Sequence, residues 1–97
     1  MIVERKRLSD QEVARELAGL SGWSVQTGKL HKQFTFQDFT RAFGFMAQVA
    51  LIAQAMDHHP DWCNTYNRVI IELTTHDLGG ISTLDVELAR RVDLLLA

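Results

Sequence analysis

Residues 57–76 read DHHPDWCNTYNRVIIELTTH and contain a predicted β-hairpin together with three of the four histidines of the chain. Apolar and polar residues alternate on both sides of a tight turn near Asn67, which is typical of two paired strands. A hairpin that folds back at this turn brings the residues before its first strand beside those after its second strand. We therefore expect His58 and His59 to lie near His76, at one end of a sheet.

A long helix is expected to precede this hairpin and to end near Met56, because Pro60 cannot continue a helix and favours extended geometry in the residue before it. Thr35 is the expected N-cap, with Asp38 at the third position of a capping box. The apolar residues of this helix fall into two stripes, which together are wider than one core-facing side requires. The first stripe contains Phe36, Phe39, Phe43, Met46, Ala50 and Ala53, and the second contains Ala42, Phe45, Val49, Ile52 and Met56. Part of the helix is therefore expected to contact another subunit.

Start signals for a further helix occur near each end of the chain. Ser9 with Glu12, and Ser82 with Asp85, have the spacing of a helix N-cap and its capping carboxylate. Another hairpin is expected about a turn at residues 26–29. The order helix, hairpin, helix, hairpin, helix predicts an α+β fold: a four-stranded, largely antiparallel sheet with three helices packed on one face.

Length and charge limit the classes of function that the chain can have. A chain of 97 residues fits one domain, which we expect to span residues 1–97. Ten basic residues are balanced by twelve acidic ones, and the only basic cluster, residues 5–7, is short and isolated. Direct binding of nucleic acid is therefore not expected.

The single cysteine, Cys63, excludes an internal disulfide and every multi-cysteine zinc framework, and it fits a reducing compartment. The N-terminus has no apolar segment of the kind found in signal peptides, and no apolar run approaches the roughly 20 residues needed to span a bilayer. We therefore expect a cytoplasmic protein that neither spans nor binds a membrane.

The histidine cluster indicates acid–base chemistry. One neutral imidazole beside one protonated imidazole supplies a base and an acid together near neutral pH. Two other interpretations remain open: the histidines at 58 and 59 could form only a polar loop before Pro60, or three imidazoles could bind zinc. Adjacent histidines in a loop lack the helical spacing that often places two imidazoles on one metal. A site without metal is the expectation.

The residues His58-His59-Pro60, followed at characteristic spacings by Tyr66, His76 and Asp85, resemble the signature of the pterin-4a-carbinolamine dehydratases, also known as dimerisation cofactors of a homeodomain transcription factor. The resemblance runs from about Leu8 to the end of the chain. Further matching elements are Gly22-Trp23, Phe34-Thr35-Phe36, Asp38-Phe39, residues 42–45, Thr75-His76 and Gly79-Gly80-Ile81-Ser82. Several spaced elements in the right order are far more specific than a histidine pair alone.

This resemblance implies dehydration of a 4a-hydroxytetrahydropterin to quinonoid dihydropterin and water, which recycles the pterin oxidised by aromatic amino acid hydroxylases. It implies that His58 and His76 are the acid and base candidates and that His59 positions the carbon bearing the hydroxyl group. A flat heterocycle that must gain a proton on one group and lose one from another suits acid and base groups on either side. No cofactor is expected.

The resemblance also implies contacts with the pterin. Asp57 and the backbone of Thr75 are the expected polar contacts, and Trp62 is the expected wall of the pocket. Gln54 stands where the family usually has an ionisable residue, often glutamate; its amide can hydrogen-bond a pterin but carries no charge. Tyr66 is expected to have a packing role.

An alternative function is a non-catalytic module that binds other proteins and keeps only a vestigial pterin site. The complete set of three histidines favours the enzyme. In either case the resemblance and the wide apolar surface of the long helix predict a homodimer or homotetramer. A charge at Phe45 or Val49, in the second stripe, is expected to lower the oligomeric state.

Overall fold

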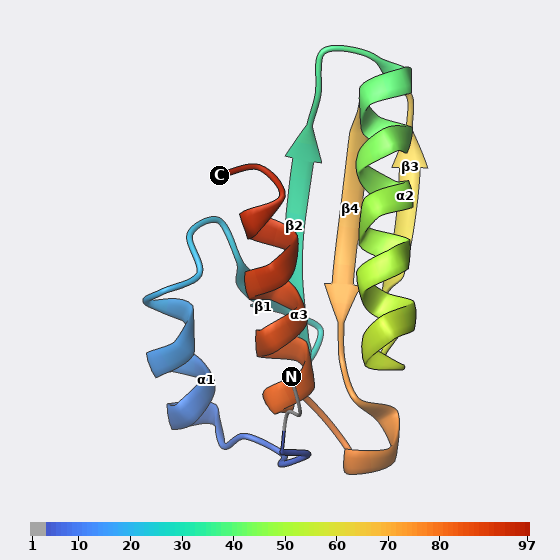
Figure 1. The fold of residues 1–97 in the computed structure, drawn as a ribbon. Helices are drawn as coiled ribbons and strands as arrows, with labels where there is room; N and C mark the ends of the chain where they lie inside the picture. Colours follow the sequence, from blue (N-terminus) through green and yellow to red (C-terminus); the bar gives the residue numbers. More distant parts are fainter. Residues whose placement is uncertain (1–3) are drawn as a thin grey trace.

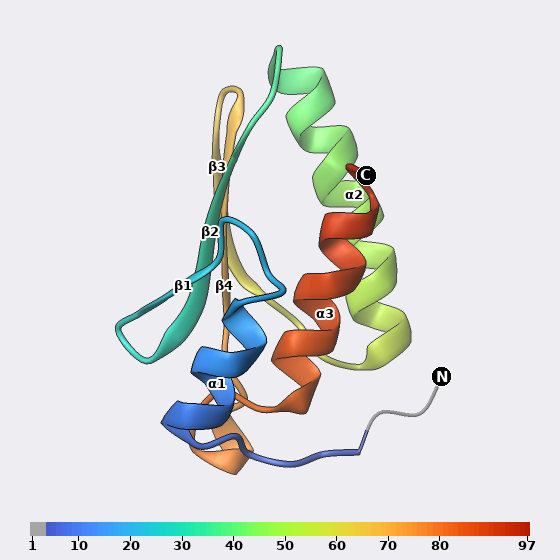
Figure 2. The same cartoon turned by 90° about the vertical axis from the view of Figure 1, so that its left-hand side faces the viewer.

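The computed structural model describes residues 4–97. Met1–Val3, which begin the segment expected to lack a signal peptide, lie outside the described residues. The elements in chain order are α1 (Asp10–Leu17), β1 (Ser24–Gln26), β2 (Lys29–Thr35), α2 (Phe39–Met56), β3 (Asp61–Thr65), β4 (Arg68–Leu73), the 3-10 helix η1 (His76–Leu78) and α3 (Thr83–Leu94). The four strands form one antiparallel sheet in the order β1-β2-β4-β3. Helices α2 and α3 lie side by side over one face of this sheet (Figures 1 and 2). The predicted α+β fold is therefore confirmed.

The helix starts near the two ends of the chain agree with their sequence signals. At α1 the Ser9 side chain accepts from the Glu12 backbone, and the Glu12 side chain accepts from the Ser9 backbone. Ser82 and Asp85 form the equivalent capping box at α3. Each box satisfies backbone donors that the first turn of a helix leaves without partners.

The N-cap predicted for α2 was wrong. The cap is Asp38, whose Oδ1 accepts a hydrogen bond of 2.8 Å from the backbone of Arg41. Thr35 is instead the last residue of β2, where it pairs with Arg68. A residue held in a sheet ladder cannot also begin a helix, so α2 starts later than the local pattern indicated.

The core lies between the sheet and the helices, and it shows which stripe of α2 is internal. Ala42, Phe45 and Val49 of the second stripe are buried in the core, together with Val69, Ile71 and Leu73 from β4. Ala53, at the end of the first stripe, is buried as well. Phe39 and Phe43 remain exposed. The expectation that a charge at Phe45 or Val49 would act on an outer surface was therefore wrong, because both side chains belong to the core of the domain itself.

The face of the sheet opposite α2 and α3 carries polar side chains that pair across strands. Lys29 Nζ lies 3.1 Å from Asp61 Oδ2, and His31 Nδ1 lies 3.1 Å from Glu72 Oε2. Opposite charges that face each other across strands stabilise such a sheet face modestly. Within residues 4–97, no helix combines the length and the apolar character needed to cross a bilayer.

Candidate active site

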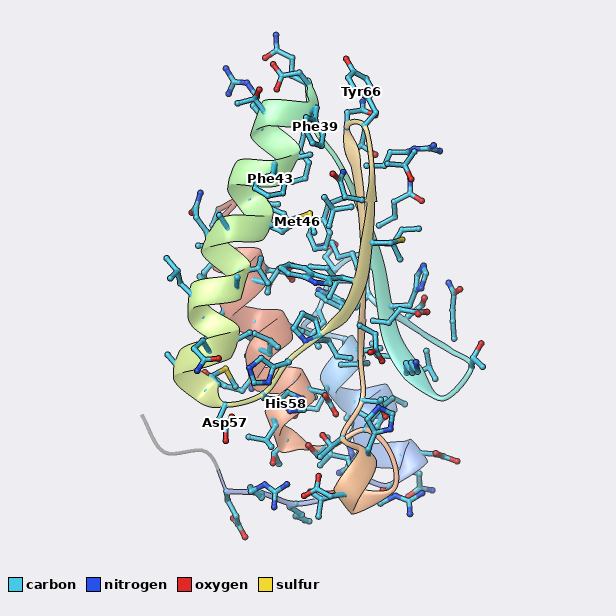
Figure 3. The ribbon with its side chains drawn as sticks, turned by 90° about the vertical axis from the view of Figure 1, so that its right-hand side faces the viewer. Phe39, Phe43, Met46, Asp57, His58 and Tyr66 are labelled. Carbon is cyan, nitrogen blue, oxygen red and sulfur yellow. The ribbon has the colours of Figure 1, made fainter. Side chains whose placement is uncertain are left out.

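The end of α2 delivers two histidines to the edge of the sheet. Asp57 takes a left-handed conformation with φ of 51° and caps the helix, and the His58 amide then donates to the carbonyl of Ala53 at 3.0 Å. This turn directs the chain toward β3 and places Asp57 and His58 at the C-terminal end of α2 (Figure 3). Pro60 follows and prevents further helix.

All three histidines of the predicted cluster line one open depression of about 330 Å³. His58 and His59 come from the loop after α2, and His76 comes from η1, just after β4. The other lining residues are Asp57, Thr74, Thr75 and Asp77. The hairpin topology therefore brings the histidines together as the sequence predicted.

His58 is the buried member of the cluster and contacts a buried carboxylate. Only 8% of His58 is exposed, and its Nε2 lies 2.5 Å from Oδ1 of Asp85, which is fully buried. If Nε2 carries the proton and donates to Asp85, Nδ1 keeps its lone pair. The carboxylate thus fixes the orientation of the ring and selects which nitrogen can accept a proton.

Asp85 is itself held by a closed hydrogen-bond network. Its Oδ2 accepts from Thr75 Oγ1 and from the Ser82 backbone, both at 2.8 Å. The Thr75 and Ser82 hydroxyl groups lie 2.6 Å apart. With His58 Nε2 in its protonated tautomer, three donors converge on the two oxygens of this carboxyl group.

The other two histidines are exposed. His59 Nε2 lies 3.0 Å from Oε1 of Gln54, in the last turn of α2. His76 lines the same depression, as does its sequence neighbour Asp77. A hydrogen bond from Arg5 holds the pKa of Asp77 below its ordinary value, and the charges of Arg5 and His58 add smaller effects in the same direction.

The profile of the family described as pterin 4 alpha carbinolamine dehydratase matches residues 6–95. The chain belongs to this family. A relative from Synechococcus sp. (strain WH7803) is 60% identical over 76 residues, which cover 78% of this chain and 82% of the relative. A relative from Solibacter usitatus (strain Ellin6076) is 52% identical over 91 residues, which cover 94% of this chain and 96% of the relative. Both are provisionally named pterin-4-alpha-carbinolamine dehydratases.

A solved structure gives the same fold. The crystal structure of a transcriptional coactivator/pterin dehydratase from Brucella melitensis superposes with a TM-score of 0.90 at 42% sequence identity. The match covers 95% of this chain and 100% of that one. The pterin-dehydratase family therefore accounts for the whole domain described here.

The other residues expected in the pterin-dehydratase site differ in how they are placed. Asp57 lines the depression, whereas Trp62 packs against the core and is absent from the lining. Gln54 is also absent from the lining and reaches the site only through His59. Tyr66 lies at the tip of the β3–β4 hairpin, at the far end of the molecule from His58 (Figure 3).

The backbone of Thr75 is already engaged within the loop that carries His76. Its amide donates to the Gly80 carbonyl at 2.9 Å, and its carbonyl accepts from the amides of Leu78 and Gly80. Both backbone groups of Thr75 therefore have partners within the chain, and its expected backbone contact with the pterin stays a prediction. The Thr75 hydroxyl serves the site instead, through Asp85.

Sequence reasoning missed two aspects of this site. Thr74 and Asp77 line the depression, and their only signal was that they flank Thr75-His76. Asp85 was assigned to helix capping alone, although its second oxygen binds His58. Among the described residues, no group of three or more His, Cys, Asp or Glu side chains is arranged to hold a metal ion.

Proposed function

We propose that this protein dehydrates a 4a-hydroxytetrahydropterin to the quinonoid dihydropterin and water. In this reaction the bond between C4a and the hydroxyl oxygen breaks, and the hydroxyl group leaves as water after receiving a proton. N5 loses its proton, and its electron pair forms the double bond between N5 and C4a. One acid and one base are required, and the atoms balance without a cofactor.

The observation that carries this proposal is the pairing of His58 with Asp85 at the wall of a depression shared with two more histidines. We assign the base to His58, which takes the N5 proton at Nδ1. The buried Asp85 carboxylate stabilises the imidazolium that forms, in the manner of a carboxylate that supports a catalytic histidine. Its hydrogen bonds from Thr75 and Ser82 keep it in place during the reaction.

We assign the acid to His76, which faces the depression from the other loop and gives its proton to the leaving hydroxyl group. Its exposure lets it regain a proton from water after each turnover. His59 positions the carbon that bears the hydroxyl group, with its ring held by Gln54. The product class fits a role in recycling the pterin that aromatic amino acid hydroxylases oxidise.

A direct assay tests the proposal. Freshly generated 4a-hydroxytetrahydropterin is mixed with the protein, and formation of the quinonoid product is followed against the uncatalysed rate in the same buffer. We expect catalysed dehydration that survives exhaustive chelation, because acid and base are both side chains. A rate equal to that of buffer refutes the dehydratase, and loss of activity on chelation with rescue by zinc refutes the metal-free mechanism.

The outer side of α2 supports a second proposal, that the protein is a homo-oligomer. Phe39 and Phe43 are 50% and 57% exposed, and their ring centroids lie 6.0 Å apart. They lie with Met46 along the side of α2 that borders β3 (Figure 3), and β3 is an edge strand. Association of copies would cover both the apolar surface and the strand edge. We propose a dimer as the minimum unit, and a tetramer as its further assembly.

The same apolar surface is the feature that would serve a non-catalytic binding module. The buried carboxylate argues for the enzyme, because a module has no need of a histidine held by a buried acid. The two functions separate in the assay above, since a module gives no dehydration at any protein concentration.

A further inference from the structure

A second hollow, of about 430 Å³, is lined in part by the end of the loop between β4 and α3. It is enclosed by the segment before α1, one side of α1, the β1–β2 turn and Gly79-Gly80-Ile81. Its lining shares no residue with the histidine depression. Its walls are mainly apolar, with Leu8, Val13, Leu17, Val25 and Ile81. The volume is in the range of sites that bind small molecules, about 300–1,000 Å³.

One guanidinium group, that of the exposed Arg7, lies at this hollow. A Cβ added to Gly79 would lie 3.3 Å from Nη1 of Arg7, and one added to Gly80 would lie 3.3 Å from Nε. The two glycines therefore let the guanidinium group lie against the backbone of the loop. Within residues 4–97, the Arg7 side chain makes no hydrogen bond and no ion pair, whereas Arg5 and Arg91 each bind a carboxylate.

We propose that this hollow binds a small monocarboxylate with an apolar body. A guanidinium group is planar and presents paired N–H donors that match a carboxylate, while apolar walls match the rest of such a molecule. Asp10 also lines the hollow and places a negative charge near the same space. That charge disfavours anions with two charges, such as phosphate, relative to a single carboxylate.

The probe is 4-phenylbutyrate, titrated into the ¹⁵N-labelled full chain and followed by NMR. We expect saturable shifts of the amides of Gly28, Gly79, Gly80 and Ile81, which border the hollow. The alcohol 4-phenylbutanol keeps the apolar body without the charge, so it should bind roughly tenfold more weakly or worse. Inorganic phosphate should give no saturable shifts at these amides.

Three variants separate the proposed contacts. Arg7→Gln should weaken 4-phenylbutyrate roughly tenfold or more and leave 4-phenylbutanol unchanged. Ala14→Phe, on the exposed side of α1 that lines the hollow, should fill it and abolish binding of both molecules. Arg15→Gln removes an equal charge from α1 outside the hollow and should match the wild type.

Equal affinity for acid and alcohol, or shifts confined to His58, His59 and His76, would overturn the proposal, and so would a wild-type titration without saturable shifts.

Discussion

His58 Nε2 lies 2.5 Å from Asp85 Oδ1, although 27 positions separate the two residues in the sequence. The contact joins the loop after α2 to the first turn of α3. An amide in place of this carboxylate can still accept from Thr75 and Ser82 with its oxygen, but its nitrogen then faces His58. The ring must respond with the other tautomer, in which Nδ1 carries a proton and cannot act as a base.

Asp85→Asn is therefore expected to lower kcat by roughly 10²-fold while KM changes little. Steady-state dehydration kinetics measure both quantities. Asp38→Asn is the matched control, because asparagine is an equally good N-cap and Asp38 lies at the opposite end of α2. A wild-type kcat in Asp85→Asn would show that the carboxylate serves only the helix.

Removal of His58 and removal of His76 should slow the reaction alike but affect stability differently. Each alanine variant should lose roughly 10²-fold or more in turnover, the usual range for a general acid or base. His58→Ala also leaves a buried carboxylate oxygen without its donor, at a cost of about 1–3 kcal/mol in the free energy of unfolding. His76 is exposed, so His76→Ala should stay within about 0.5 kcal/mol of the wild type.

Urea titrations and turnover assays on both variants decide this prediction. His31→Ala, which removes a histidine from the open face of the sheet, should keep full activity. Equal stability of the His58 and His76 variants would mean that the buried pair contributes nothing to folding. Undiminished turnover in either variant would remove that histidine from the mechanism.

His59→Ala should instead raise KM at least as much as it lowers kcat.

Gln54→Glu places a carboxylate where the amide oxygen lies 3.0 Å from His59 Nε2. A negative charge at this distance favours the protonated imidazole, so the pH–rate profile should move toward higher pH. The shift should be modest and should shrink in high salt, because both side chains are exposed. Gln48→Glu adds the same charge to an exposed position of α2 away from His59, and its profile should not move. Identical profiles for the two variants would show that residue 54 does not influence the site.

Phe43→Asp should lower the oligomeric state without disturbing the histidines. The side chain is more than half exposed in the single chain, so a charge there does not enter the core. Leu94→Asp is the matched control, since Leu94 is 71% exposed at the end of α3. Sedimentation equilibrium at micromolar concentration measures the mass of each variant. A monomeric wild type refutes the assembly, and an unchanged oligomer in Phe43→Asp moves its interface elsewhere.

The ion pair of Arg5 with Asp77 should stabilise the protein only above the acidic range. The hydrogen bond from Arg5 lowers the pKa of Asp77 in the folded state. The ion pair therefore stabilises the fold fully above the ordinary pKa of 3.8, and this stabilisation is lost as the pH falls through the lowered pKa of the folded state. Arg5→Gln should therefore be less stable than the wild type at pH 7, and the difference should disappear in acid and in 1 M salt. Thermal unfolding measures this difference in stability, with Arg41→Gln as the control variant. A difference that persists in acid would assign the effect to packing.

The sequence predicted those parts of the fold that depend on neighbouring residues. Both terminal helices start at short cap patterns, and strand alternation is equally local, so each could be recognised directly. Thr35 and Asp38 both resemble caps, and only the pairing of Thr35 with Arg68 across the sheet decides between them. Likewise, the stripes of α2 were visible, but which of them faces the sheet depends on where β4 packs.

For the candidate site, too, some features could be predicted from the sequence and others could not. The hairpin topology was sufficient to bring His76 beside His58 and His59. It could not reveal the partner of His58, because Asp85 satisfies a local capping pattern completely and gives no sign of a second contact. Trp62 shows the converse: it closely follows His59 in the sequence, but its strand position packs it against the core and not into the site.

The capping box of α3 also has a consequence for partly folded chains. One oxygen of Asp85 completes the first turn of this helix, and the other orients the proposed base. A chain in which α3 has not yet nucleated therefore has no anchored imidazole, even if the sheet and α2 are already formed. The histidine site is complete only in a chain that has formed α3, so partly folded forms that lack this helix should have no dehydratase activity.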